Sequence, residues 1–419
     1  MRKNILLAAL AAVLSVLGST AFAQKASELK YYNVRDLGLK LVNQGFQDCV
    51  RDGSAVKDAQ VKGATEYDAN MQKPAEATEK KVSEGPVNDG YFTRLPARIE
   101  GKVRKAVWDL GQNSAGIAIR FRSNAKVIGA RWTLLNNFRM SHMTPTGICG
   151  FDLYALNDGE WRFVGTAQPN GKESINVFRR NMNGQMRDYV MFFPLYDGVI
   201  DLSIGVEEGA VVEQPTVIGN NPFGGKSTKP VVVYGTSVTQ GGCATRPGMV
   251  FTNILSRKLK REFVNLGFSG NGRMDRIMAE EMARIDAGAY LIDCLGNCTQ
   301  QTVKDSTEAF IKTIADAHPD VPVFMISNYP YAYEWIDAGT FEDVSGEDAL
   351  WYDAYRKLRA EGYKNLRYIE IGGKHNPLDP MQGSAIGPDH EGTVDGCHLT
   401  DLGFLRMADF LYPYLKRVK

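Results

Sequence analysis

Short apolar runs alternate with longer amphipathic stretches from about residue 229 to residue 416. The first run, residues 230–234, reads Pro-Val-Val-Val-Tyr and is continuous, which is typical of a strand buried on both faces. The same pattern predicts strands at 263–268, 289–294, 321–327 and 366–371, and helices at 249–260, 273–286, 303–317, 346–361 and 400–416. Strands that alternate with helices indicate an α/β fold built on a doubly wound parallel sheet.

A different rhythm precedes this region and suggests a second domain. Between about residues 90 and 215, turns rich in Gly, Asn and Asp separate short segments, several of which alternate apolar with polar residues. Strands are expected at 107–110, 115–121, 127–132, 150–156, 161–165, 189–193 and 199–206. This spacing is typical of a β-sandwich. The expected organisation is a weakly structured lead-in, an all-β, jelly-roll-like sandwich domain and an α/β domain, at 24–85, 86–220 and 226–419.

The N-terminus has the order of features of an export signal. Arg2 and Lys3 precede an almost wholly apolar stretch, residues 5–17, and Ala-Phe-Ala follows at 21–23. This order predicts a signal peptide over 1–23, with cleavage before Gln24. No later segment is apolar for long enough to span a bilayer. The mature chain is therefore expected in the periplasm or outside the cell, without a membrane span.

The charge balance gives no reason to expect a polyanionic partner. The chain carries 49 basic and 48 acidic side chains, for a formal net charge of +1. Nothing in that balance favours nucleic acid or an anionic membrane surface. The sequence does not specify an oligomeric state.

The loop after the first strand of the α/β domain is the first candidate for a functional site, since ligands bind beyond the carboxyl ends of parallel strands. Residues 235–242 read Gly-Thr-Ser-Val-Thr-Gln-Gly-Gly and place the hydroxyl of Ser237 at that edge. A phosphate-binding P-loop would need Gly-Lys-Ser/Thr, which is absent. A nucleophile elbow would need Gly two positions after the serine, where this chain has Thr239.

Three further segments add polar groups near the same edge. Gly270 and Asn297 lie on the loops that follow the second and third strands of the α/β domain. Asp395 and His398 stand three residues apart, on a loop that runs into the last helix. An ionised carboxylate can hold the Nδ1–H of an imidazole, which leaves Nε2 free to take a proton from a serine.

Together and in this order, the four segments resemble the SGNH hydrolase superfamily, also called GDSL-like lipases and esterases, over about residues 230–415. The first block of that family reads Gly-Asp-Ser-x-Thr, and Thr236 here replaces its Asp, which is not a triad member. The third block departs further, because Cys298 replaces the last Asp of Gly-x-Asn-Asp. The resemblance implies a flavodoxin-like α/β/α domain.

The resemblance also assigns the site residues. The implied triad is Ser237 as nucleophile, His398 as base and Asp395 as the carboxylate that orients the base. The implied oxyanion hole consists of the backbone amides of Ser237 and Gly270 and the side chain of Asn297. No metal or cofactor is implied.

The upstream region carries a second resemblance. Residues 150–154 read Gly-Phe-Asp-Leu-Tyr, similar to the Gly-x-Asp-Leu-Tyr signature of a β-domain that precedes SGNH domains in bacterial exported esterases. Segments 143–147 and 193–198 fit this resemblance. Together the two resemblances imply hydrolysis of small carboxylic esters through an acyl-enzyme, with acetylated glycans as the expected substrates. The alternatives are a lipid or short-chain acyl esterase, a non-catalytic glycan-binding protein with the same fold, and a thiol enzyme.

Other residues could compete for roles in the site. His318 is expected to be structural, whereas His375 and His390 lie on a long loop that could line the site, and Asp389 is a second candidate carboxylate. His142 and Asp152 could reach the site only if the β-domain packs over it, and Asp152 is expected to be structural within the sandwich. The cysteines permit disulfides in an exported protein, and a bridge between two of three loop cysteines is one hypothesis: Cys243, Cys298 and Cys397. Cys294 and Cys298 lack partners at zinc-ligand spacing.

Overall fold

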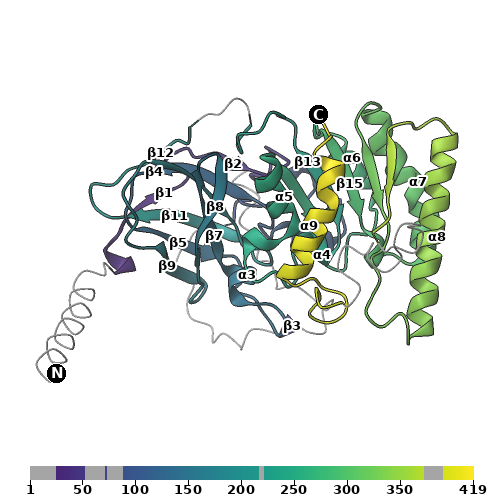
Figure 1. Cartoon of the computed structure of the whole chain (residues 1–419), viewed down its shortest axis with the longest axis horizontal. Helices are drawn as coiled ribbons and strands as arrows, with labels where there is room; N and C mark the ends of the chain where they lie inside the picture. Colours follow the sequence, from purple (N-terminus) through teal and green to yellow (C-terminus); the bar gives the residue numbers. More distant parts are fainter. Residues whose placement is uncertain (1–24, 52–70, 73–87, 217–220, 372–389) are drawn as a thin grey trace, which may run out of the picture.

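The computed structural model describes residues 25–51, 71–72, 88–216, 221–371 and 390–419. These residues form antiparallel β-sheets and a parallel sheet flanked by helices, arranged side by side (Figure 1). The expected signal peptide, residues 1–23, lies outside the described residues. No helix in the described part of the chain is both long and apolar enough to cross a bilayer.

The N-terminal domain is a β-sandwich, as the sequence predicts. One sheet has the strand order β1-β11-β5-β9, and the other has the order β12-β4-β10-β7-β8, with β2 paired to β4. The strands are β1 (Lys30–Asn33), β2 (Leu41–Val42), β4 (Ala118–Ser123), β5 (Ile128–Leu134), β7 (Phe151–Asn157), β8 (Glu160–Ala167), β9 (Glu173–Arg179), β10 (Arg187–Phe192), β11 (Val199–Val206) and β12 (Val212–Glu213). Strand β3 (Met71–Gln72) pairs with β6 (Arg139–Met140), and the short helix α3 (Pro145–Cys149) precedes β7.

Two local predictions for this region are wrong. The expected lead-in contains β1 and β2, which pair antiparallel with β11 and β4 and so belong to the sandwich. Strands this short carry no readable alternation, so their pairing alone reveals them. Residues 107–110, expected as a strand, lie in helix α2 (Lys105–Gly111). Val107 and Trp108 pack into a cluster with Leu95, and this tertiary burial overrides the β-propensity of the segment.

The C-terminal domain has the predicted doubly wound parallel sheet, with the strand order β14-β13-β15-β16-β17. Its first strand lies between the second and third, which is the flavodoxin-like arrangement. The strands are β13 (Val231–Gly235), β14 (Phe263–Gly267), β15 (Ala289–Asp293), β16 (Val323–Ile326) and β17 (Leu366–Ile369). The helices are α4 (Ser237–Gln240), α5 (Phe251–Leu259), α6 (Arg276–Met282), α7 (Gln300–Ala317), α8 (Ala338–Ala360) and α9 (Asp401–Leu415). Its 3-10 turns are η4 (Pro247–Met249) and η5 (Leu295–Asn297), and two further 3-10 turns lie in the N-terminal part of the chain: η1 (Ala26–Glu28) and η3 (Ala97–Ile99).

The central strand β13 is covered on both faces, because successive side chains of a strand point to opposite sides. Val231 and Val233 belong to a cluster that includes residues of α5 and α9. Val232 and Tyr234 belong to a second cluster with residues of α6, α7 and α8. The continuous apolar run that predicted a buried strand therefore serves two hydrophobic layers at once.

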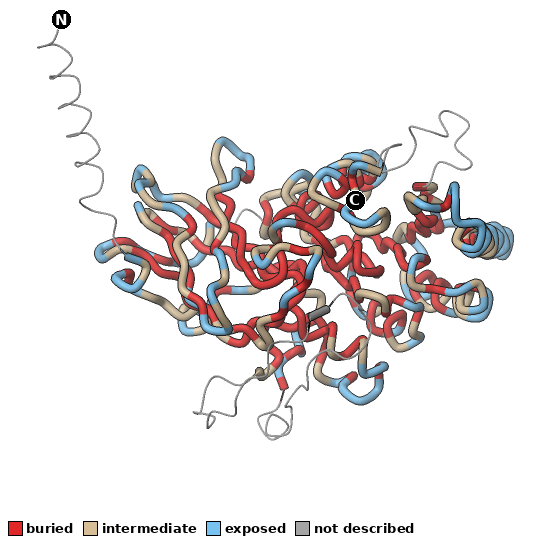
Figure 2. Tube along the Cα trace, turned by 90° about the horizontal axis from the view of Figure 1, so that it is seen from below, coloured by how far each residue is buried: buried red, intermediate tan, exposed pale blue. Residues whose placement is uncertain are grey.

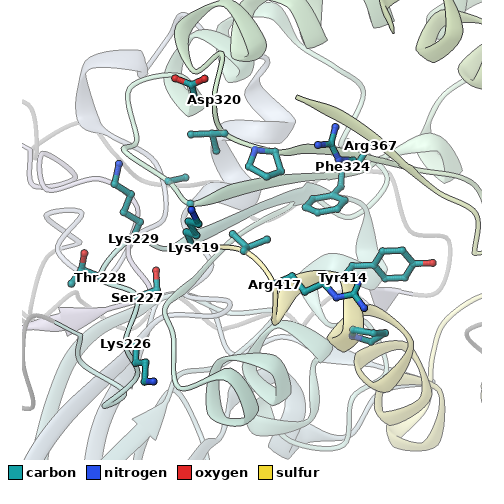
Figure 3. A pocket seen from close by; sticks show the side chains of 16 residues that line it. Lys226, Ser227, Thr228, Lys229, Asp320, Phe324, Arg367, Tyr414, Arg417 and Lys419 are labelled. Atoms are coloured by element: carbon teal, nitrogen blue, oxygen red, sulfur yellow. The ribbon is translucent and has the colours of Figure 1, made fainter. Parts of the chain in front are cut away.

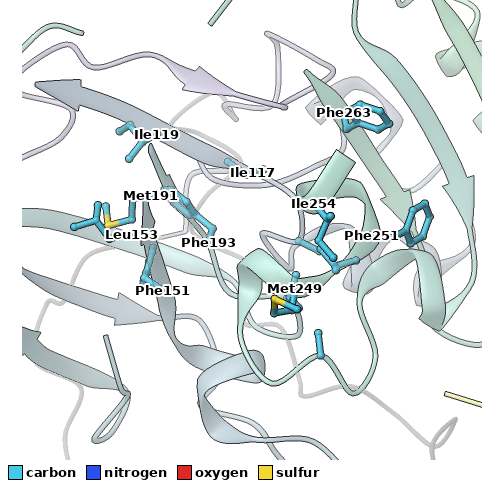
Figure 4. Close-up of a cluster of buried hydrophobic side chains, with 14 of the residues drawn as sticks. Ile117, Ile119, Phe151, Leu153, Met191, Phe193, Met249, Phe251, Ile254 and Phe263 are labelled. Carbon is cyan, nitrogen blue, oxygen red and sulfur yellow. The ribbon is translucent and has the colours of Figure 1, made fainter. Parts of the chain in front are cut away.

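The sandwich and the parallel sheet share one hydrophobic cluster. Phe151, Met191 and Phe193 of the sandwich domain are in the same cluster of buried side chains as Phe251 and Ile254 of α5 (Figure 4). Buried residues lie on both sides of the boundary between the two domains (Figure 2). Because the two domains share this apolar cluster, the β-domain has a fixed position relative to the parallel sheet.

Candidate active site

Ser237 is the first residue of α4, the short helix that follows β13, and is 7% exposed. The turn before it is capped by Thr236, whose Oγ1 accepts a hydrogen bond from the N–H of Val238 (3.2 Å). The residue that departs from the family motif thus still provides an N-cap oxygen. Glycine is required at position 235, because a Cβ there would lie 2.1 Å from Oγ1 of Thr239.

The side chains of Ser237, His398 and Asp395 form one chain of hydrogen bonds. Oγ of Ser237 lies 2.9 Å from Nε2 of His398, and Nδ1 of His398 lies 2.7 Å from Oδ2 of Asp395. Oδ1 of Asp395 accepts the backbone N–H groups of His398 (2.7 Å) and Cys397 (3.0 Å). Partial burial acts to raise the pKa of Asp395, but the hydrogen bonds from His398 outweigh it and hold that pKa below its usual range. Asp395 is therefore an ionised acceptor that can orient the imidazole.

The loop that carries Asp395 and His398 is fixed by its own turn and by a neighbouring segment. The N–H of Val394 donates to the carbonyl of His398 (2.9 Å), and Gly396 at the tip has a φ of +85°, which favours glycine. The N–H of Ala332, which follows β16, donates to the carbonyl of Gly396 (2.9 Å). The base is thus supported from outside its own loop.

Gly270 and Asn297, the other expected oxyanion-hole residues, lie on loops linked to the nucleophile turn. The N–H of Ser269 donates to Oε1 of Gln240 in α4 (3.0 Å). The N–H of Gly272 donates to Oδ1 of Asn297 (3.3 Å), which orients that amide group. Gly270 itself has a φ of +64° and no atom within 4 Å of the position of a Cβ. The loops that follow β14 and β15 are therefore connected to each other, and the first of them is connected to α4. The role of Gly270 and Asn297 as oxyanion donors stays a prediction.

The Gly-Phe-Asp-Leu-Tyr segment of the β-domain forms hydrogen bonds with the C-terminal α/β domain. Oδ2 of Asp152 accepts hydrogen bonds from Nη1 of Arg246 (2.6 Å) and from the N–H of Gly248 (2.8 Å), and Oδ1 accepts from Thr166 (2.7 Å). The same Nη1 lies 2.7 Å from the hydroxyl of Tyr154. Asp152 is fully buried. Its structural role was predicted within the sandwich, whereas its partners show that it joins the two domains.

The β-domain also contacts the nucleophile turn directly, through residues that sequence reasoning missed. The hydroxyl of Tyr196 donates to the backbone carbonyl of Ser237 (3.2 Å). Nε2 of Gln240 donates to the carbonyl of Leu195 (3.1 Å). Both contacts come from segment 193–198, which the sequence marked only as part of the β-domain resemblance. The turn that presents the serine is therefore supported by two domains.

His142 of the β-domain reaches the site, because that domain packs beside it. Its ring centroid lies 5.7 Å from that of His398. A donor atom of His142, one of His398 and Sγ of Cys243 all lie within 4.8 Å of one another. Nδ1 of His142 is buried and has no hydrogen-bond partner. Positions 142, 243 and 398 are too far apart in the chain for a local motif to reveal this cluster.

The other histidines and the second candidate carboxylate are not shown in contact with the triad in the described part of the chain. Nε2 of His318 lies 2.8 Å from the carbonyl of Ala283, which agrees with the structural role expected for it. His390 has a φ of +55° and a buried, unpartnered Nδ1. His375 and Asp389 lie outside the described residues.

The cysteines form no disulfide, and one of the three loop cysteines, Cys397, is poorly suited to act as a nucleophile. None of the six, all of which lie in the described part of the chain, is in a disulfide, so the hypothesised bridge between two of Cys243, Cys298 and Cys397 is not formed. Burial, and then the charge of Asp395, raise the pKa of Cys397 to about 12. A thiol with such a pKa is protonated at neutral pH and is a poor nucleophile.

A buried carboxyl group supports the nucleophile turn from the sheet side. Asp293, at the end of β15, accepts a hydrogen bond from Oγ1 of Thr239 (2.8 Å). Burial raises the pKa of Asp293 to about 7, although that hydrogen bond acts against the shift. The group is therefore partly protonated near neutral pH.

A cavity of about 1000 Å³ lies at the opposite, amino-terminal edge of the sheet (Figure 3). It is lined by residues that precede the strands and by the end of the last helix, and its charged residues are mostly cationic: Lys226, Lys229, Asp320, Arg367, Arg417 and Lys419. Because Ser237 follows the carboxyl end of β13, this cavity is separate from the candidate active site.

The fold and the site together define a carboxylic ester hydrolase of the α/β type, with a serine held by a histidine and a carboxylate. Residues 228–416 match the family model described as GDSL-like lipase/acylhydrolase, and residues 69–212 match the model described as the N-terminus of SGNH-hydrolase-type esterases. A crystal structure described as a GDSL-like lipase from Bacteroides ovatus ATCC 8483 is 30% identical, with a TM-score of 0.74, and covers 93% of this chain and 98% of that one. The chain therefore belongs to the GDSL-like lipase/acylhydrolase family.

A more distant likeness extends over the same two domains. A salicylyl-acyltransferase from a tetracycline biosynthetic pathway is 13% identical, with a TM-score of 0.63, and covers 94% of this chain and 100% of that one. At that identity the likeness concerns the fold alone. The comparison with curated protein sequences found no match.

Proposed function

We propose that this chain is an exported serine esterase that removes acetyl groups from carbohydrate. The observation that carries the catalytic part of this proposal is the continuous hydrogen-bond chain from Ser237 through His398 to Asp395, with distances of 2.9 and 2.7 Å. Export rests on the order of charged, apolar and small residues over 1–23.

The proposed reaction has two halves. Oγ of Ser237 attacks the ester carbonyl while Nε2 of His398 takes its proton, and the protonated imidazole then gives that proton to the departing alcohol. A water molecule, deprotonated by His398, then attacks the acyl-serine; the imidazolium returns that proton to Oγ of Ser237 as the carboxylic acid leaves. Asp395 stabilises the imidazolium in both halves. The backbone amides of Ser237 and Gly270 and Nδ2 of Asn297 would donate to the oxyanion, and each such donor is typically worth about 10²–10³ in rate.

An aromatic segment beside the triad supports a carbohydrate substrate. Tyr331 and Tyr333 stack with ring centroids 5.8 Å apart and an interplanar angle of 10°. A Cβ on Gly396 would lie 3.4 Å from the ring of Tyr333, so this segment borders the loop of Asp395. Trp335, two residues further, is 83% exposed. Flat aromatic faces on a fixed segment suit the C–H faces of sugar rings.

The experiment compares substrates and variants in the chain from Gln24 onward. Wild type should hydrolyse p-nitrophenyl acetate faster than longer acyl esters and should release acetate from acetylated polysaccharide, and Ser237→Ala should abolish both. Trp335→Ala should raise KM for the polysaccharide and leave p-nitrophenyl acetate hydrolysis unchanged. A preference for long acyl chains would replace the proposal by a lipid esterase. Glycan binding without hydrolysis by folded wild type would replace it by a non-catalytic protein.

A further inference from the structure

We propose that His142, Cys243 and His398 form a Zn²⁺ site whose occupation switches the esterase off. Their donor atoms come from two domains and lie within 4.8 Å of one another. With zinc–nitrogen bonds of about 2.0–2.1 Å and zinc–sulfur bonds of about 2.3 Å, tetrahedral ligands stand roughly 3.4 Å apart. Small side-chain rotations would therefore bring the three donors onto one ion.

The donor set suits zinc. Two imidazoles and one thiol are borderline or soft ligands, which favour Zn²⁺ over the hard cations Mg²⁺ and Ca²⁺. Binding would release the thiol proton of Cys243 to solvent, because the thiolate is the ligand. Three protein ligands leave a fourth position for water, so the site needs no further residue.

Two local features favour a ligand here. Nδ1 of His142 is buried without a hydrogen-bond partner, and an unpaired buried polar atom is costly unless something binds it. Cys243 has a φ of +74°, a backbone conformation that is unfavourable for a non-glycine residue and is concentrated at functional sites. The contacts in the proposed mechanism use neither His142 nor Cys243, so the esterase reaction does not account for these features.

The geometry explains why metal binding and catalysis would exclude each other. Nδ1 of His398 is engaged by Asp395, so only Nε2 can bind an ion. That nitrogen is the one that lies 2.9 Å from Oγ of Ser237 and would accept its proton. Once its lone pair is on zinc, His398 cannot act as a base. Asp395 would meanwhile orient the metal ligand, as carboxylates do for zinc-bound histidines.

The test measures binding and activity separately, because only the inhibition rests on the proposed esterase function. Metal-free protein is titrated with Zn²⁺ by calorimetry, with Mg²⁺ and Ca²⁺ as comparison ions. Wild type should bind one zinc per chain, and Cys243→Ser and His142→Ala should each weaken that binding by at least about tenfold. Cys298→Ser, which removes a buried thiol from a neighbouring loop, should bind zinc like wild type.

In parallel, p-nitrophenyl acetate hydrolysis is followed at each zinc concentration and after a chelator is added. Zinc should inhibit wild type reversibly, and the zinc concentration for half inhibition should rise at least about tenfold in Cys243→Ser and His142→Ala, relative to each variant's own activity. Equal zinc affinity in wild type and both variants, or zinc that binds and raises activity, would overturn the proposal. Zinc bound through these residues in a protein without esterase activity would retain the site and reject the proposed function.

Discussion

Replacing Asp152 by Ala is expected to weaken the junction between the two domains far more than replacing it by Asn. Asp152 is fully buried and accepts hydrogen bonds from Arg246, Gly248 and Thr166. An Asn can turn its carbonyl oxygen towards Arg246 and Gly248 and its NH₂ towards the hydroxyl of Thr166, which can accept. Asp152→Asn therefore keeps every hydrogen bond and removes only the charge.

The magnitudes follow from the same contacts. Burial raises the pKa of Asp152 even though Arg246 acts against that shift, so the charge itself contributes little to the free energy of folding. Asp152→Asn should thus cost about 1 kcal/mol. Asp152→Ala leaves the N–H of Gly248 and one side of the Arg246 guanidinium unpaired, which should cost about 3–5 kcal/mol. At about 2–4 °C per kcal/mol, the Ala variant should unfold roughly 10 °C earlier.

Thermal unfolding of wild type, Asp152→Asn and Asp152→Ala measures this difference. Glu208→Ala, a change at an exposed carboxylate of the same domain, is the control and should unfold with wild type. The reasoning is refuted if Asp152→Ala unfolds within about 1 °C of wild type. It is equally refuted if Asn destabilises as much as Ala, because the charge rather than the hydrogen bonds would then hold the domains together.

Three further changes test the remaining parts of the site. Gly147→Ala would place a Cβ 2.1 Å from the carbonyl oxygen of Ala244, so it should lower the free energy of unfolding by about 1–3 kcal/mol. The same clash lies between the two domains and should also lower esterase activity. Tyr196→Phe removes a hydrogen bond to the carbonyl of Ser237 and should lower kcat/KM about fivefold, for a loss near 1 kcal/mol. Burial raises the folded-state pKa of Asp293 from 3.8 to about 7, so its contribution to stability is full below about pH 4 and is lost as the pH rises to 7. In urea unfolding, the stability of wild type should therefore fall over this pH range, and Asp293→Asn should lack this part of the fall.

The α/β domain could be predicted from the sequence because its signals are local. A strand buried on both faces must be apolar at every position, as residues 231–234 are, and each flanking helix has its own apolar stripe. Ser237, Asp395 and His398 can be proposed as a triad from the sequence because their blocks follow in the order of a known family. The structure brings these three side chains together.

The parts that were missed depend on contacts between distant segments. Strands β1 and β2 are too short to show a period, and residues 107–110 form a helix because their partners are elsewhere in the chain. Tyr196 contacts the nucleophile turn, and His142 lies beside His398, only because the two domains share a core. Packing between the domains determines such contacts, and the spacing of residues within one segment therefore cannot predict them.

The most direct test of the central claim is to trap the acyl-enzyme. Wild type is exposed briefly to p-nitrophenyl acetate, quenched in acid and digested, and the acetylated peptide is identified by mass spectrometry. We predict acetyl groups on Ser237 in wild type, none in Ser237→Ala, and strongly reduced labelling in His398→Ala, although both variants unfold at the wild-type temperature. Acetylation at another side chain, or rapid hydrolysis that persists in Ser237→Ala, would contradict the proposed mechanism.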